Sequence, residues 1–124
     1  MSSLDRRKYP RISEVLPCQI AVGSSSFVAE TKNLSCGGAL CQLPQPLPLM
    51  TKLEVVLNLP SSEGSSDRPI QILGVVVRQD PVSVSGGSAS YLTAIYFSEI
   101  KLEDRRQIGE FVLRSMLSHD RRRS

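Results

Sequence analysis

The chain has 124 residues, a length typical of one domain with a single hydrophobic core. Hydrophobic residues make up 40% of it, charged residues make up 22%, and the net charge of +3 is too small for a protein that coats long nucleic acids. No apolar run approaches the roughly 18 residues that span a bilayer, and none follows the basic residues near the N-terminus, so we expect no membrane insertion, no secretory signal and a cytoplasmic location.

Six short strands are predicted in chain order, with little helical periodicity among them. The first two, residues 18–22 and 27–32, flank a Gly-Ser-Ser turn and form a hairpin. The other four cover residues 38–43, 52–59, 70–79 and 90–97. Closely spaced strands of this kind favour a mainly β protein, with an antiparallel barrel or sandwich.

The C-terminal region has a different pattern. Between residues 102 and 117, apolar residues recur at helical spacing while charged residues occupy the other positions, which predicts an amphipathic helix covering one end or face of the barrel. We therefore predict one domain over residues 1–124. Its parts are a flexible basic segment (1–15), a barrel (16–99), a helix (100–118) and a basic tail (119–124).

Positive charge gathers near both ends of the chain. Residues 1–32 carry five basic and three acidic side chains, and residues 101–124 carry seven and four. This distribution indicates an anionic partner that is met near the termini. Duplex DNA is not expected, because it would require a stronger basic face and a recognisable docking helix.

The first motif that stands out is the basic segment Arg6-Arg7-Lys8-Tyr9-Pro10-Arg11. Arg7 and Arg11 have an R-x-x-x-R spacing, and Pro10 favours an extended or turning backbone instead of a helix. A guanidinium group can grip phosphate oxygens in pairs and can also bind the O6/N7 edge of guanine. Taken alone, such a segment is also typical of a solvated tail.

The second motif is Asn33-Leu34-Ser35-Cys36-Gly37-Gly38, between the second and third predicted strands. Asn33 and Ser35 are two residues apart, so on an extended backbone they project from the same side. Their oxygens could accept hydrogen bonds from guanine N–H groups, and Gly37 and Gly38 allow a ligand to approach the main chain. Taken alone, this motif is also typical of a tight turn between strands.

Together and in this order, the two motifs resemble those of the PilZ domain family. The resemblance extends to residues 74–78, 91–97 and 102–117, which are similar to a late barrel strand, the closing strand and the C-terminal helix of that family. It implies a six-stranded antiparallel β-barrel with a C-terminal helix that binds cyclic di-GMP, a bacterial second messenger.

The resemblance also implies roles for single residues. Arg7 and Arg11 would hold phosphates and guanine edges, Asn33 and Ser35 would meet a guanine base, and Gly38, with Gly37 beside it, would let the base approach. Asn33 departs from the aspartate that is common in the family, which predicts somewhat weaker guanine recognition.

An arginine directly before the first motif, here Arg6, tends to accompany the binding of two intercalated nucleotide molecules instead of one. Four positive charges, on Arg6, Arg7, Lys8 and Arg11, would match the four negative charges of two dinucleotides. Lys8 and Arg78 are further candidate ligand residues. We expect ligand binding to order the N-terminal segment over the barrel, and a downstream protein partner to read the changed surface.

Two other binding functions stay open on the sequence. The basic ends could dock on an acidic protein partner without any nucleotide, and a barrel could bind oligonucleotides, although the chain has only six aromatic residues for stacking. An enzyme is not expected, because no nucleotide fingerprint is present and His119, in the C-terminal tail, is a poor candidate for a catalytic base. Neither a cofactor nor a metal is expected, because the three cysteines (Cys18, Cys36 and Cys41) form no ligand pattern.

Overall fold

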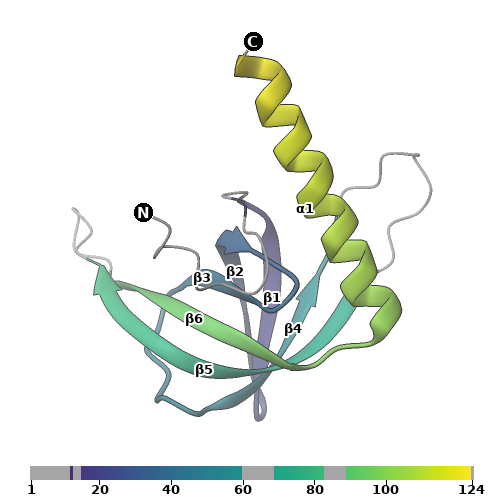
Figure 1. Ribbon diagram of the computed structural model, residues 1–124. Coiled ribbons are helices and arrows are strands. Elements are labelled where there is room, and N and C mark those ends of the chain that lie inside the picture. Colours follow the sequence, from purple (N-terminus) through teal and green to yellow (C-terminus); the bar gives the residue numbers. More distant parts are fainter. Residues whose placement is uncertain (1–11, 13–14, 60–68, 83–88, 124) are drawn as a thin grey trace.

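The computed structural model describes residue 12 and residues 15–59, 69–82 and 89–123, with side chains described up to Leu117 (Figure 1). Six antiparallel strands close into a barrel in the order β1–β2–β3–β6–β5–β4. The strands are β1 (Pro17–Val22), β2 (Ser25–Leu34), β3 (Gly38–Leu43), β4 (Lys52–Leu57), β5 (Ile70–Val82) and β6 (Ser90–Glu99), and the helix is α1 (Leu102–Arg123). The predicted six-stranded antiparallel barrel with a C-terminal helix is confirmed.

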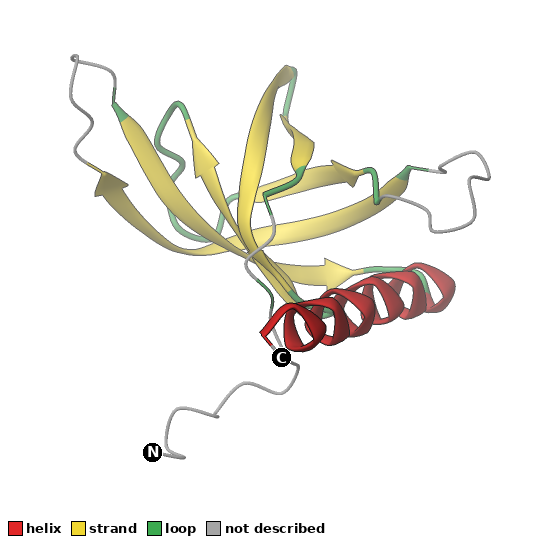
Figure 2. Cartoon of the chain, turned by 90° about the horizontal axis from the view of Figure 1, so that it is seen from above, coloured by secondary structure: helices red, strands yellow, loops and turns green. Residues whose placement is uncertain are grey.

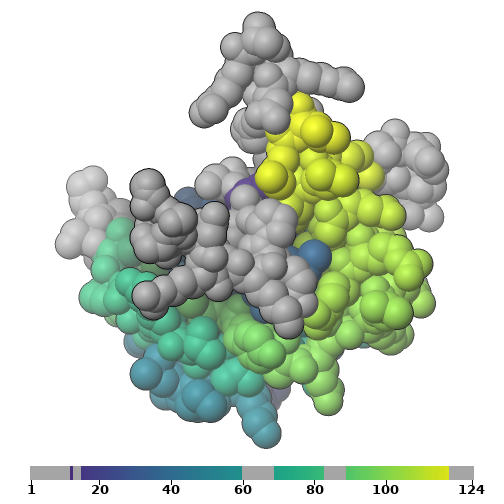
Figure 3. All heavy atoms as spheres, viewed as in Figure 1, coloured from purple at the N-terminus to yellow at the C-terminus, as the bar shows by residue number. Residues whose placement is uncertain are grey.

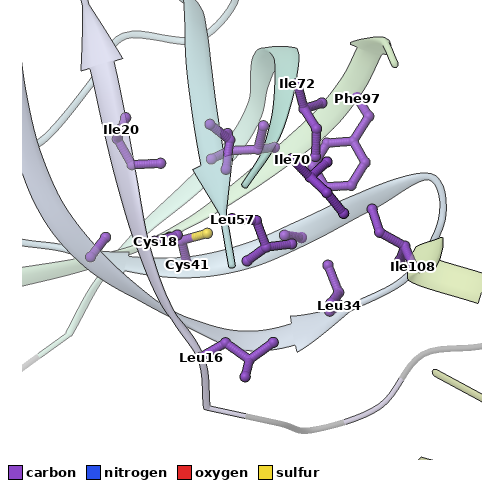
Figure 4. Packing of buried hydrophobic residues seen from close by; sticks show 14 of the residues in the cluster. Leu16, Cys18, Ile20, Leu34, Cys41, Leu57, Ile70, Ile72, Phe97 and Ile108 are labelled. Carbon is purple, nitrogen blue, oxygen red and sulfur yellow. The ribbon is translucent and has the colours of Figure 1, made fainter. Parts of the chain in front are cut away.

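The barrel interior is filled by alternate residues of each strand. Successive side chains of a strand point to opposite faces, so an alternating pattern places one set inside. Ile20, Val55, Ile72 and Ile95 belong to four different strands and are each at most 2% exposed. Figure 4 shows side chains of this set, including Ile20 and Ile72, converging on one core. Their burial supplies the main stabilisation of the fold.

Helix α1 packs its apolar face against the barrel and then extends past it. Ile108 is fully buried and points toward Leu34 and Phe97, which closes one side of the core (Figure 4). The C-terminal half of α1 runs beyond the strands (Figure 1), and Figure 2 shows the helix lying along one side of the barrel. The helix begins at Leu102, within the predicted helical segment 100–118, and continues to Arg123, so residues 119–123 are helical where the sequence predicts a tail.

Strands β2 and β5 are both longer than the sequence predicts, and each contains a bulge. Strand β2 continues to Leu34, with a register shift between Thr31 and Asn33. Strand β5 continues to Val82, through an Asp-Pro pair that lies beyond the predicted strand, with a shift between Val76 and Arg78. A bulge inserts one residue and reverses the inside–outside alternation that follows it. Both bulges change which side chains reach the outer face of the barrel.

Candidate ligand-binding site

A cavity of about 800 Å³ lies on the outer face of the barrel, over β3, β6 and β5. Its floor includes Leu40 of β3, which pairs with Ala94 of β6, and Ala94 in turn pairs with Arg78 of β5. These side chains point outward because their neighbours along the strands, such as Cys41 and Ile95, are buried inside. Figure 3 shows the face that β5 and β6 share with α1.

Asn33 reaches the cavity because of the bulge in β2. Thr31 and Leu34 are three residues apart, yet both are buried inside the barrel, which leaves Asn33 on the outer side. Within the described residues, the side-chain oxygen of Asn33 is buried and has no hydrogen-bond partner. A buried acceptor without a donor is unfavourable, so a ligand N–H group placed there would be stabilised.

Ser35 forms the hydrogen bonds that close the turn between β2 and β3. Its backbone N–H donates to the Gly38 carbonyl over 2.9 Å, and its hydroxyl accepts from the Gly37 N–H over 3.1 Å. The hydroxyl also donates to the Gly38 carbonyl over 3.3 Å. The Phe97 N–H donates to the Gly37 carbonyl over 3.0 Å, which ties the turn to β6. The serine and glycine spacing therefore has a structural purpose as well as the expected role in ligand binding.

Gly38 stands where β3 and β6 approach each other closely. A Cβ atom at this position would lie 2.5 Å from the carbonyl oxygen of Ile95, which is too short for any real contact. The packing of the barrel therefore requires a glycine here. The resemblance attributes the same glycine to the approach of a base, and the two reasons are compatible.

Arg78 faces the cavity because of the bulge in β5. Strict alternation from the buried Val76 would direct Arg78 into the core, but the inserted residue turns it outward. Its Nε donates to the carboxylate of Asp80 over 3.0 Å, and both side chains are mostly exposed. Gln79 instead points inward and donates to the hydroxyl of Thr93 over 3.2 Å.

The N-terminal candidates Arg6, Arg7, Lys8 and Arg11 lie outside the described residues. Ile12, the next residue after Arg11, is described and is only 6% exposed. It forms a bridge with Leu34, with N–H to carbonyl distances of 3.1 Å and 3.0 Å in the two directions. The basic segment therefore joins the described structure beside Asn33.

Sequence analysis does not identify the other residues that line the cavity. Leu40, Leu92, Ala94 and Tyr96 are outward-facing residues of β3 and β6, and Arg105 comes from α1. A signal for the strand residues exists, because both strands have apolar residues at consecutive positions instead of alternate ones. Such a pattern indicates that the outer face is also covered, by the protein or by a ligand.

Cys36 joins the turn to the helix. Its thiol donates to the backbone carbonyl of Arg105, with a sulfur to oxygen distance of 3.6 Å. Burial raises the pKa of Cys36, and the positive charge of Arg105 opposes that rise. The thiol is therefore protonated at neutral pH and acts as a contact between the turn and α1.

A second, more open cavity of about 710 Å³ lies between β4, β5, β6 and the start of α1, and Arg105 lines this cavity too. No group of three or more His, Cys, Asp and Glu side chains in the described part of the chain could hold a metal ion. Among the residues that the structure describes, no helix has both the length and the apolar character needed to cross a membrane.

The barrel, its C-terminal helix and the cavity beside the Asn-x-Ser-x-x-Gly turn define a small β-barrel domain with a candidate ligand site on its outer face. The family model of the PilZ domain matches residues 5–114, so the chain belongs to the PilZ domain family, as the two motifs indicate. Comparison with curated proteins finds no sequence match.

Several solved structures have the same fold. The Bacillus subtilis inhibitor of motility MotI (DgrA) is 27% identical, with a TM-score of 0.74 over 92% of this chain and 52% of that chain. The PilZ domain of Escherichia coli YcgR, solved with c-di-GMP, is 19% identical, with a TM-score of 0.71 over 96% of this chain and 97% of that domain. The K. pneumonia MrkH–c-di-GMP complex is 20% identical, with a TM-score of 0.72 over 95% and 56%. This chain spans about half the length of the MotI and MrkH chains.

Proposed function

We propose that the chain is a receptor for cyclic di-GMP that binds the nucleotide in the cavity over β3, β6 and β5. One observation carries the proposal: the cavity is lined by Asn33, Ser35, Gly37 and Gly38, and the arginine segment joins the barrel directly beside it, through the bridge between Ile12 and Leu34. YcgR and MrkH, which share the fold, were both solved with this ligand, which supports the choice of nucleotide.

The cavity has the chemistry that a guanine base requires. The buried side-chain oxygen of Asn33 lacks a donor within the described residues, and the N–H groups of guanine can supply one. The apolar floor, with Leu40 and Ala94, offers a surface for the flat face of the base. Arg78, at the edge of this floor, is an additional ligand residue if it exchanges its bond with Asp80 for one with the nucleotide.

Arg7 and Arg11 would bind the phosphates and guanine edges from the N-terminal side. Arg11 precedes Ile12, and consecutive Cα atoms are about 3.8 Å apart, so its backbone starts next to the Ile12–Leu34 bridge. Arg7 is four residues before Arg11 in the sequence. Arg6 and Lys8 would balance the charge of a second, intercalated molecule.

The signal would be the rearrangement of the N-terminal segment on the barrel surface. Phosphate binding recruits Arg6, Arg7 and Arg11, and several charge-assisted hydrogen bonds offset the entropy lost when the segment is ordered. A downstream protein partner would then read the new surface.

The principal test is the double substitution of Arg7→Ala with Arg11→Ala, measured by calorimetry with cyclic di-GMP. Each lost charge-assisted bond costs about 1.5–3 kcal/mol, so the affinity should fall by at least ~100-fold. A double substitution of Arg121→Ala with Arg122→Ala removes the same charge from the far end of the chain and should leave the affinity within about twofold. If the first variant binds as tightly as the unchanged chain, the assignment is wrong.

The number of bound molecules has its own test. The unchanged chain should bind two molecules of cyclic di-GMP, and Arg6→Ala should bind one, as measured by the stoichiometry of the titration. If Arg6→Ala binds as many molecules as the unchanged chain, Arg6 does not hold a second molecule.

A further inference from the structure

Helix α1 brings a basic side chain to the same cavity. Arg105, close to the start of the helix, lines the cavity with Asn33 and Ser35 and is half-buried. Arg106, the next residue, is exposed and does not line it. Two adjacent arginines of one helix therefore differ in whether they face the ligand site.

The contact between α1 and the Ser35–Gly38 turn determines where Arg105 lies. Asp104 and Ile108 lie on the buried face of the helix. Arg105 and Gly109 each follow one of them in the sequence and are four residues apart, so they share the neighbouring flank of the helix. This flank meets Cys36 at both points. The thiol donates to the Arg105 carbonyl over 3.6 Å, and a Cβ at Gly109 would lie 3.3 Å from the sulfur. Gly109 thus lets the helix approach the turn that binds the ligand.

The charge of Arg105 acts on the turn as well. It opposes the effect of burial on the pKa of Cys36, which stands between Ser35 and Gly37. The other described cation that lines the cavity, Arg78, already shares its charge with Asp80 at 3.0 Å. Arg105 also has interactions within the chain, so an anionic ligand has to compete for it.

We propose that Arg105 is a ligand-binding residue that donates a charge-assisted hydrogen bond to a phosphate of cyclic di-GMP and so couples the bound nucleotide to α1. This inference rests on the proposed function. Arg7 and Arg11 belong to the N-terminal segment, whereas Arg105 is presented by a helix that packs on the barrel. Ligand binding to Arg105 would therefore also fix the start of α1 against the turn.

The test compares Arg105→Ala with Arg106→Ala, by calorimetry with cyclic di-GMP on the full chain. Loss of one charge-assisted bond should weaken binding by about 10- to 100-fold in Arg105→Ala. Arg106→Ala should bind within about twofold of the unchanged chain, because an exposed charge outside the cavity contributes little. Arg105→Lys retains the charge without the planar fork and should give an intermediate affinity.

The salt dependence of binding distinguishes a direct contact between Arg105 and the nucleotide from a structural effect of the substitution. If Arg105 contacts a phosphate, the affinity of Arg105→Ala should depend less on salt than that of the unchanged chain. Equal affinity of Arg105→Ala and the unchanged chain would overturn the role of Arg105 and leave the receptor function intact. A loss of affinity that Arg105→Lys does not relieve, with unchanged salt dependence, would also overturn it. If the unchanged chain binds no cyclic di-GMP, the receptor function itself fails.

Discussion

The inner and outer faces of β3 and β6 are both apolar, but they differ in how completely the protein covers them. On the inner face, Cys41 is fully buried and Ile95 is 2% exposed. On the outer face, Leu40 and Ala94 are half-buried, and Tyr96 is 58% exposed. The same two strands therefore complete a core on one side and leave a hollow on the other.

This difference shows that apolar content alone does not distinguish a core from the floor of a surface cavity. The inner face is closed by six strands and by Ile108 of α1. The outer face is bounded by the Ser35–Gly38 turn, by Arg78 and by Arg105, which bring polar groups to its edge. An incompletely covered apolar floor with polar groups around it is typical of a small-molecule site.

The largest expected effect comes from the inner face. Ile95→Ala removes a buried side chain from the middle of β6 and should lower the free energy of unfolding by about 2–5 kcal/mol. Tyr96→Ala, one residue away on the outer face, should change it by no more than about 0.5 kcal/mol. Urea denaturation of both variants measures the difference. Similar losses in the two variants would contradict the distinction between the faces.

Gly38→Ala is expected to have the next largest effect, because it tests the contact that holds β3 against β6. The added methyl group would meet the Ile95 carbonyl at 2.5 Å, and the backbone shift that relieves this clash should cost about 1–3 kcal/mol. The loss should appear in denaturation of the chain without nucleotide. If stability without nucleotide is unchanged while binding is lost, Gly38 serves ligand approach alone.

The strands and the family could be predicted because they depend on local patterns. Short runs rich in apolar residues mark the strands, and the arginine and Asn-x-Ser-x-x-Gly motifs are short stretches of sequence. The helix could be predicted for the same reason, although its last turns could not: beyond Leu117 no apolar residue marks a packed face.

The cavity could be predicted only in part, because bulges and long-range packing shape it. Nothing local in the sequence indicates that a bulge turns Arg78 away from the core. The position of Arg105 depends on contact between residues 69 positions apart in the chain, at Cys36. Asn33 was identified from its motif, but the bulge that directs it outward was not.

A substitution on the outer face should affect binding more than stability. Leu40→Glu places a negative charge on the floor of a cavity proposed to hold an anionic nucleotide, and should weaken cyclic di-GMP binding at least ~10-fold. Leu40→Gln introduces a side chain of nearly the same shape as glutamate but without the charge, so it should lose less affinity for cyclic di-GMP. Calorimetry measures both, and an unchanged affinity of Leu40→Glu would show that the nucleotide does not lie on this face.

The smallest effect on stability should come from ionisation of a buried thiol of the inner face, and this ionisation matters only at alkaline pH. A hydrogen bond with Cys18, together with burial, raises the pKa of Cys41 well above its ordinary value of 9.0. In the unfolded chain the thiol ionises near that ordinary value, whereas in the folded chain it stays protonated to higher pH. The unfolded state therefore binds fewer protons above about pH 9, and stability present below this pH is lost as the pH rises toward the folded pKa.

The slope for one such thiol is at most about 1.4 kcal/mol per pH unit. Cys41→Ala should be less stable than the unchanged chain at pH 7, because it leaves a small cavity, but its stability should fall less steeply above pH 9. Denaturation curves at several pH values compare the two slopes. Parallel slopes would mean that Cys41 titrates alike in the folded and unfolded chains, and that the inner face at this point is as open to water as the outer one.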